Sequence, residues 1–169
     1  MKVISLSQPW ATCVVIGAKR YETRSWRTNY RGPLLIHAAK RYPSDAKHFA
    51  FRLFFDSGDG NKSLLQNHHP LLHEGFLKAL VYAEHLPTGA IIGKVKLIDC
   101  IPTESVRDCL SAQEKLLGNY EDGRWAWKLE NYEMFDKPVP AKGALGLWDW
   151  EEKTSYEAEL ERGRGRLAL

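Results

Sequence analysis

Residues 7–26 read SQPWATCVVIGAKRYETRSW, and this stretch predicts a short helix, a turn and a strand in immediate succession. Ser7 is typical of a helix N-cap, Pro9 suits the first helical turn, and apolar residues then recur at helical spacing. Glycine at the end of a helix favours a left-handed turn. We therefore expect Gly17 to end the helix and to direct Lys19 into the space beside the next strand.

The segment that follows, residues 21–26, reads as extended chain and places Glu22, Arg24 and Trp26 on one face. At this spacing we expect Glu22 and Arg24 not to pair with each other, so that each takes a separate partner or a ligand. A carboxylate here would accept a hydrogen bond from the exocyclic amine of a base. The alternative is structural, with the two side chains tying down a loop.

The rest of the chain alternates short strands with helices. Strand patterns cover residues 2–7, 34–38, 90–101, 124–132 and 145–150, and helical patterns cover residues 44–56, 71–84 and 103–117. This order predicts an α+β fold, a small mixed or antiparallel β-barrel with surrounding helices. We expect one domain over residues 1–150, with a helical insertion around residues 43–86, and a charged tail at residues 151–169.

Positive charge is concentrated in the first quarter of the sequence. Residues 1–41 contain eight lysines and arginines against one acidic residue, Glu22, which gives a net charge of +7, whereas the whole chain carries +3. Aromatic residues are interspersed with these charges. Such a mixture is typical of segments that bind phosphates and stack bases. The alternative is a solvated basic face above aromatic residues of the core.

Composition excludes several classes of protein. The chain has 169 residues, of which 44% are hydrophobic and 27% are charged, as in one soluble globular domain and unlike collagen or a disordered protein. Its three cysteines never occur as Cys-x-x-Cys, so neither a disulfide framework nor a zinc site is expected. Because no apolar run is long enough for a membrane span and no signal peptide is recognisable, we expect a cytoplasmic protein without a membrane partner.

We expect no cofactor and no metal ion. A Gly-rich phosphate loop, a dinucleotide fingerprint and a Ser-His-Asp hydrolase pattern are absent from the sequence. His68, His69 and His73 lie near Glu74, but Pro70 interrupts the helical face that would bring the histidines together.

Four motifs together resemble the ASCH domain. They are Ser-Gln-Pro-Trp-Ala at residues 7–11, Gly-Ala-Lys-Arg-Tyr-Glu-Thr-Arg at residues 17–24, Arg-Trp at residues 124–125 and Pro-Ala-Lys-Gly at residues 140–143. The Gly-x-Lys-x-x-Glu-x-Arg core is the most specific, and the pattern is most similar to the short, single-domain members of the family. The resemblance implies a PUA-like β-barrel with a positively charged cleft for RNA, single-stranded nucleic acid or a modified nucleoside.

The motif and the basic segment supply the candidate ligand-binding residues, which are Trp10, Lys19, Glu22, Arg24, Trp26, Arg27, Arg31, His37 and Lys40. At least one of Trp125 and Trp127, which share a strand face, should belong to the core. Trp10 or Trp26 is therefore the better candidate for stacking a base. His37 follows an apolar strand, where a histidine is more often hydrogen-bonded in place than catalytic.

Two classes of function follow from the resemblance. The first is a module that binds RNA or single-stranded nucleic acid without chemistry. The second is a small hydrolase, either an amidohydrolase acting on acetylcytidine-type nucleosides or a ribonuclease. The amidohydrolase pattern has a Lys, a Thr three residues later and a distant Glu, and here Glu22 occupies the Thr position.

Thr23 is one residue away and should point to the opposite face of the strand. If the protein is an enzyme, Lys19 and Glu22 are the expected catalytic residues, with Glu114 or Glu121 as the distant carboxylate. The sequence leaves open the choice between RNA and DNA, the oligomeric state and whether any reaction is catalysed.

Overall fold

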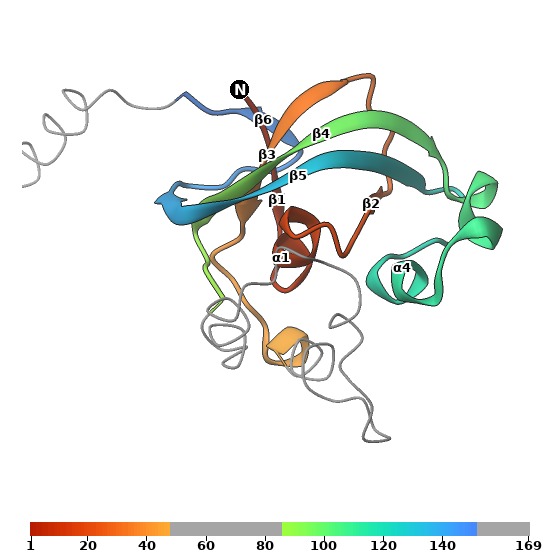
Figure 1. Ribbon diagram of the computed structural model, residues 1–169, viewed down its shortest axis with the longest axis horizontal. Coiled ribbons are helices and arrows are strands. Elements are labelled where there is room, and N and C mark those ends of the chain that lie inside the picture. Colours follow the sequence, from red (N-terminus) through yellow and green to blue (C-terminus); the bar gives the residue numbers. More distant parts are fainter. Residues whose placement is uncertain (48–85, 152–169) are drawn as a thin grey trace, which may run out of the picture.

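The computed structural model describes residues 1–47 and 86–151, which form a curved, six-stranded mixed sheet with helices packed on it (Figure 1). The strands are β1 (Lys2–Leu6), β2 (Tyr21–Arg24), β3 (Gly32–Ala38), β4 (Ala90–Pro102), β5 (Trp125–Pro140) and β6 (Leu147–Asp149). Their order is β2-β5-β4-β3-β1-β6, with β1 and β3 parallel and all other neighbours antiparallel. The predicted α+β class and barrel-like mixed sheet are confirmed.

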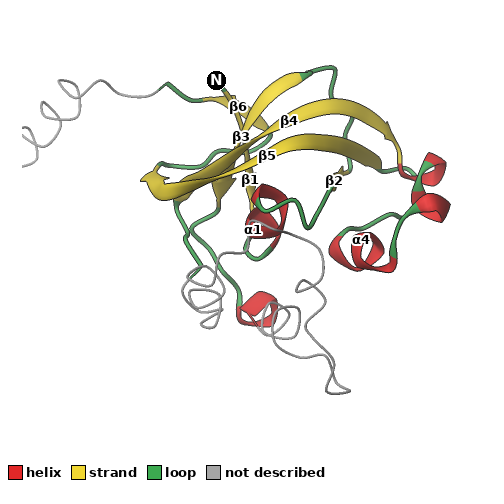
Figure 2. Cartoon of the chain, viewed as in Figure 1, coloured by secondary structure: helices red, strands yellow, loops and turns green. Residues whose placement is uncertain are grey.

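Helix α1 (Trp10–Val15) lies beneath the arch of β4 and β5 and fills the concave side of the sheet (Figures 1 and 2). Its residues 11–15 are buried, and all of them except Thr12 belong to the main hydrophobic core. The helix approaches β4 closely at Gly93, where a Cβ would lie 2.7 Å from Cγ1 of Val15 and 2.3 Å from the carbonyl oxygen of Glu133. Glycine is therefore required for this contact.

Gln8, and not Ser7, secures the start of α1. The N-cap position is Pro9, and no side chain caps it. The Oε1 atom of Gln8 instead accepts hydrogen bonds from the backbone N and the Oγ1 of Thr12, at 3.2 and 2.9 Å. Its Nε2 donates to the carbonyl oxygen of Pro87 at 2.8 Å. The prediction of a Ser7 cap is wrong because Ser7 stays exposed, whereas the longer, buried Gln8 side chain reaches the next turn.

The predicted helix over residues 103–117 is replaced by two 3-10 turns, η2 (Thr103–Ser105) and η3 (Arg107–Cys109), and by helix α4 (Ala112–Leu117). Thr103 does not cap a helix, because its hydroxyl donates to the carbonyl oxygen of Glu121 at 2.7 Å and ties the segment to the loop before β5. Ser111 caps α4 instead, its Oγ accepting from the backbone N of Glu114.

The ends of the last two strands also differ from the prediction. The strand predicted over residues 124–132 continues to Pro140, and the last strand is shorter than predicted. Residues 44–47 are helical, in agreement with a helix beginning at Ser44. The rest of that helix, the helix predicted over residues 71–84 and all but Glu151 of the tail predicted over residues 151–169 lie outside the described residues. The domain boundaries therefore stay predictions.

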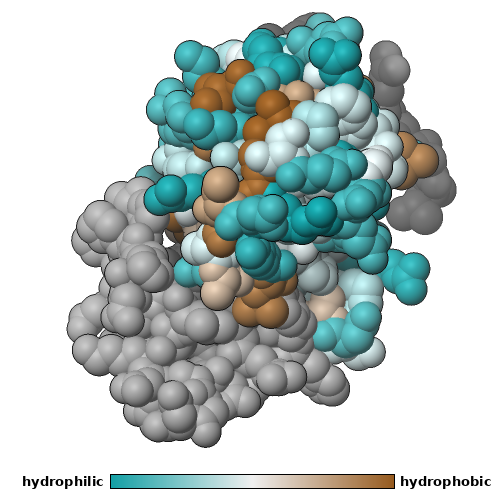
Figure 3. All heavy atoms as spheres, turned by 90° about the vertical axis from the view of Figure 1, so that its right-hand side faces the viewer, coloured by the Kyte–Doolittle hydropathy of each residue, from teal (hydrophilic) through white to brown (hydrophobic). Residues whose placement is uncertain are grey.

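The convex face of the sheet carries a second, smaller hydrophobic cluster of Val3, Leu35 and Ile91, against which Trp148 packs. The side of the molecule with α4 is mostly hydrophilic, with small apolar spots (Figure 3). Within the described residues, no helix is both long enough and apolar enough to cross a membrane.

Replacement of Gln8 by Ala should lower the free energy of unfolding by about 1–3 kcal/mol, because it leaves buried donors of Thr12 and the Pro87 carbonyl without their partner. Urea denaturation measures this change. Gln113→Ala is the control, since Gln113 makes one such bond, to the carbonyl oxygen of Ala18, and is more exposed. Equal losses in the two variants would contradict the structural role of Gln8.

Candidate functional site

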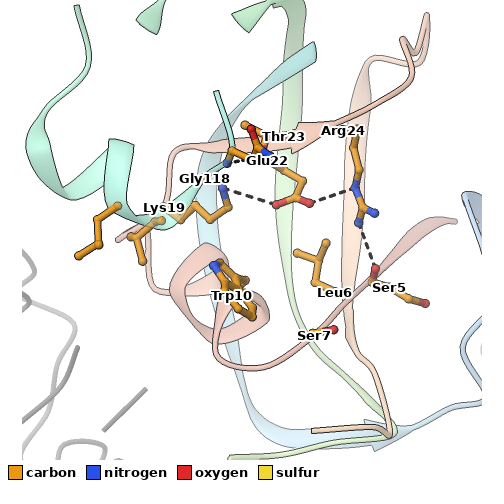
Figure 4. A pocket seen from close by; sticks show the side chains of 12 residues that line it. Ser5, Leu6, Ser7, Trp10, Lys19, Glu22, Thr23, Arg24 and Gly118 are labelled. Atoms are coloured by element: carbon orange, nitrogen blue, oxygen red, sulfur yellow. Dashed lines mark hydrogen bonds and ion pairs between the residues drawn. The ribbon is translucent and has the colours of Figure 1, made fainter. Parts of the chain in front are cut away.

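A cavity of about 470 Å³ lies between β2, the end of β1, the start of α1 and the end of α4 (Figure 4). We call it the seam cavity. It is lined by Ser5, Leu6, Ser7, Trp10, Lys19, Glu22, Thr23, Arg24, Leu116, Leu117, Gly118 and Asn119. It thus brings together four of the predicted ligand-binding residues, namely Trp10, Lys19, Glu22 and Arg24.

The cavity occupies a seam where the curved sheet does not close. Strand β6 pairs with β1 only as far as Ile4, which faces Leu147. Beyond that point the edge of β1 receives a side chain instead of a strand, because Nη2 of Arg24 donates to the carbonyl oxygen of Ser5 at 3.1 Å (Figure 4). Arg24 therefore joins β2 to β1 across the mouth of the cavity.

Three charged side chains form a row along one wall. Lys19 is only 1% exposed, and its Nζ lies 3.6 Å from Oε2 of Glu22 while donating to the carbonyl oxygen of Tyr21. Oε1 of Glu22 lies 3.0 Å from Nε of Arg24. Buried charges of this kind are tolerated only when they are paired.

The expectation that Glu22 and Arg24 do not pair is wrong. Residues two apart on a strand project from the same face about 7 Å from each other. The arginine side chain is long enough to bend back across this gap and reach the carboxylate. Lys19 likewise already has a carboxylate and a carbonyl as partners, so its charge is directed toward Glu22.

The local backbone explains why Lys19 points inward. Gly17 has φ 75°, the left-handed conformation expected at the helix end. The backbone N of Lys19 then donates to the carbonyl oxygen of Cys13 at 2.9 Å, which folds the connection back under the helix before β2 begins. The sequence prediction for this turn is confirmed.

Glu114 binds the backbone at the start of β2. Its buried carboxylate accepts hydrogen bonds from the backbone N of Arg20 and of Tyr21, at 2.9 and 3.0 Å, and from the hydroxyl of Tyr120 at 3.0 Å. Burial and the adjacent Glu114 carboxylate raise the pKa of Tyr120 far above its usual range. Glu121 is exposed and accepts from Nδ2 of Asn119. Neither glutamate lines the seam cavity.

Gly118 and Asn119 are site residues that the sequence did not reveal. A Cβ at Gly118 would lie 2.6 Å from Cε2 of Tyr120 and 3.2 Å from Nζ of Lys19, so a glycine lets the chain pass directly over the lysine. The backbone N of Asn119 donates to Oγ1 of Thr23 at 3.1 Å. Thr23 also lines the cavity, while its hydroxyl binds the loop that crosses the edge strand β2.

The remaining predicted residues lie elsewhere. Trp26 is outside the cavity lining and is half-buried against the main core, where it packs edge-on on Trp127 with ring centroids 4.7 Å apart. The guanidinium of Arg27 lies over the ring of Trp125 at 5.5 Å. Arg31 forms an ion pair with Asp99 at 3.0 Å.

The last two predicted ligand-binding residues, His37 and Lys40, line a second cavity of about 850 Å³. We call it the loop cavity. It is lined by Ser5, His37, Ala39, Lys40, Thr88, Gly89, Pro140, Ala141, Lys142, Gly143, Ala144 and Leu145. His37 is held in place as expected, with Nδ1 3.1 Å from Oγ of Ser5 and Nε2 donating to the carbonyl oxygen of Ala141 at 3.0 Å. Burial lowers the pKa of His37.

The basic segment divides into paired and unpaired charges. Lys2, Lys19, Arg24 and Arg31 each have a carboxylate within 4.0 Å. The other four basic residues of the segment are exposed, and they are Arg20, Arg27, Lys40 and Arg41. Within the described part of the chain, no carboxylate forms an ion pair with any of them. The same described ranges contain no group of three side chains that could hold a metal ion. His68, His69 and His73 lie outside them.

Comparisons with known proteins agree with the motifs. The chain matches the family model of the ASCH domain over residues 4–139. It is 29% identical over 156 residues to activating signal cointegrator 1 of Homo sapiens and of Mus musculus. The match covers 92% of this chain and 23% of each relative, so the chain spans about a quarter of their length.

Solved structures are similar at lower identity. ASCH from Zymomonas mobilis has a TM-score of 0.48 and 14% identity, over 96% of this chain and 93% of that chain. A mutant of the same protein gives a TM-score of 0.48 and 14% identity, over 96% of both chains.

Glu114→Gln should lower the free energy of unfolding by about 1–3 kcal/mol, because a carboxamide replaces one acceptor oxygen by a donor that faces the backbone N–H groups of β2. Glu121→Gln is the matched control and should change stability little, since Glu121 is exposed. Thermal and urea unfolding measure both. A stable Glu114→Gln variant would show that Glu114 does not hold the strand.

Proposed function

Because this chain belongs to the ASCH domain family, which is associated with RNA binding, we propose that it binds RNA or another single-stranded nucleic acid and admits one base, unmodified or modified, into the seam cavity. The observation that carries the proposal is the ionic row on the wall of that cavity, formed by buried Lys19 and Glu22 and half-buried Arg24. A few fixed polar groups in a concave, water-poor site are what a specific ligand pocket requires.

Size and hydrogen bonding favour a single base. The cavity volume of about 470 Å³ falls in the range of about 300–1,000 Å³ found for small-molecule sites. An ionised carboxylate has about four acceptor positions. Lys19 and Arg24 approach one oxygen of Glu22 each, which leaves capacity to accept from the exocyclic amine of a base. The two cations fix the carboxylate for this readout.

Trp10 is the aromatic candidate that lines the cavity, and it lies below the charged row in Figure 4. Single-stranded nucleic acids are recognised through bases that stack on aromatic side chains. Exposed Arg20, Arg27 and Arg41 would contact phosphates outside the cavity, because no ion pair within the described residues neutralises them. Base readout and phosphate binding are thus assigned to different side chains.

A second candidate function is hydrolysis of a modified nucleoside, and one observation favours it: Glu22, a carboxylate that can take a proton from water, lines the same cavity as Lys19. In that reaction the oxygen of a water adds to the acyl carbon, the carbon–nitrogen bond breaks, and the departing amine takes up a proton. Glu22 would accept the proton of the water. Incubation with nucleosides, N4-acetylcytidine included, separates the two functions, because only a hydrolase alters its ligand.

Single-stranded RNA should bind with an affinity that decreases as salt increases. Each neutralised phosphate contributes about −0.7 to the slope of log affinity against log salt, so three to five contacts predict a slope of about −2 to −3.5. Fluorescence anisotropy of a labelled RNA measures it, and gel analysis of the same RNA detects cleavage. Absence of binding at low salt, or a slope of zero, would contradict the proposal.

Trp10→Ala should weaken RNA binding by roughly 5- to 150-fold, the equivalent of about 1–3 kcal/mol for one stacked base. Trp26→Ala is the matched control, because Trp26 packs on Trp127 and should lower thermal stability while the folded protein keeps its affinity. Affinities are compared below the melting temperature of both variants. Equal affinity of Trp10→Ala and the unmodified protein would exclude Trp10 as the stacking residue.

A further inference from the structure

We propose that the loop cavity is a phosphate subsite for the nucleotide next to the base in the seam cavity, so that the ligand is an oligonucleotide and not a free nucleoside. This inference rests on the proposed function and names its substrate class. It follows from the charge of the loop cavity, from the way its lysines are positioned, and from the residue that the two cavities share.

The charge of the loop cavity is entirely positive. Among its twelve lining residues are Lys40 and Lys142, and none of the twelve is acidic. Both lysines are exposed, and neither has a carboxylate partner among the described residues. The seam cavity differs, because there Glu22 balances the charge of Lys19 and Arg24 in part. Of the two cavities, the loop cavity is therefore the better suited to an anion.

Hydrogen bonds hold the two lysines on adjacent segments. The backbone N of Gly89 donates to the carbonyl oxygen of Ala38 at 2.8 Å, and the backbone N of Ala141 donates to the carbonyl oxygen of Gly89 at 3.0 Å. These bonds connect the chain just before Lys40 to the chain just before Lys142. The lysines thus extend from a continuous, hydrogen-bonded rim.

The floor of the loop cavity is also fixed. The hydroxyl of Ser5 donates to the carbonyl oxygen of Ala144 at 3.0 Å, and His37 binds the carbonyl oxygen of Ala141, so the loop is held on both sides of Lys142. Gly143 lies flat against His37, where a Cβ would be 2.4 Å from Cε1 of the ring. A cavity held this firmly costs little ordering when a ligand binds.

Ser5 connects the two cavities because it lines both. Its carbonyl oxygen faces Arg24 at the seam, and its hydroxyl faces His37 on the other side of β1. Beyond Ile4, this edge of β1 carries the guanidinium of Arg24 instead of strand β6. A single strand whose base enters the seam cavity would pass over this edge, and its next phosphate would meet Lys40 and Lys142.

The test compares nucleosides with trinucleotides of the same base by isothermal titration calorimetry. The probes are the four common ribonucleosides, N4-acetylcytidine and the four homotrinucleotides. The trinucleotide of the preferred base should bind at least tenfold more tightly than its nucleoside at low salt. The double variant Lys40→Ala/Lys142→Ala should remove most of this gain, reduce the salt slope by about 0.7 for the one lost phosphate contact, and leave nucleoside affinity unchanged.

Lys96→Ala/Lys137→Ala is the matched control, since it removes the same charge from exposed positions outside both cavities. The ring signals of His37 in NMR spectra give an independent readout and should shift with the trinucleotide but not with the nucleoside. If nucleosides bind and the trinucleotide gains nothing, or if both double variants lose affinity equally, the inference is wrong and the proposed function stands. If neither nucleosides nor trinucleotides bind, the proposed function itself fails.

Discussion

The Glu22 carboxylate, held between Lys19 and Arg24, is the interaction on which the site depends. Lys19 and Glu22 are buried and Arg24 is half-buried, and the two buried charges are stable only because they are paired, since an unpaired buried charge costs several kcal/mol. All three come from one short stretch of sequence. The helix must therefore end where it does, and β2 must begin at once, for the lysine to meet the carboxylate.

The same ionic row explains why the sheet has a seam and not a closed barrel. Strands β1 and β2 are not paired, and a guanidinium joins them in place of a backbone ladder. A ladder would fill the space with main chain and would leave no cavity. A side chain crosses the gap at one point and leaves the rest of it open to a ligand.

The sequence was sufficient for what local chemistry determines. Residue type and spacing were enough to predict the Gly17 turn and the strand that begins at Tyr21. They also singled out the motif that borders the seam. Contacts between residues that are far apart in the sequence were not predictable in this way. Glu114 reaches Tyr21 across 93 positions, and the close approach of Gly118 to Lys19 depends on how α4 docks. The pairing of Glu22 with Arg24 depends on side-chain rotamers, which strand periodicity does not determine.

From the sequence, both base recognition and phosphate binding were assigned to one basic segment. The distribution of charge in the structure suggests that different side chains of that segment serve the two tasks. Cations with carboxylate partners are held in one geometry, and a fixed donor and acceptor pattern is what distinguishes one base from another. Cations without such partners lie on the surface, where their flexible side chains adapt to phosphates in any sequence. Because Ser5 belongs to both the seam cavity and the loop cavity, strand β1 would be the boundary between these two kinds of recognition under the function proposed above.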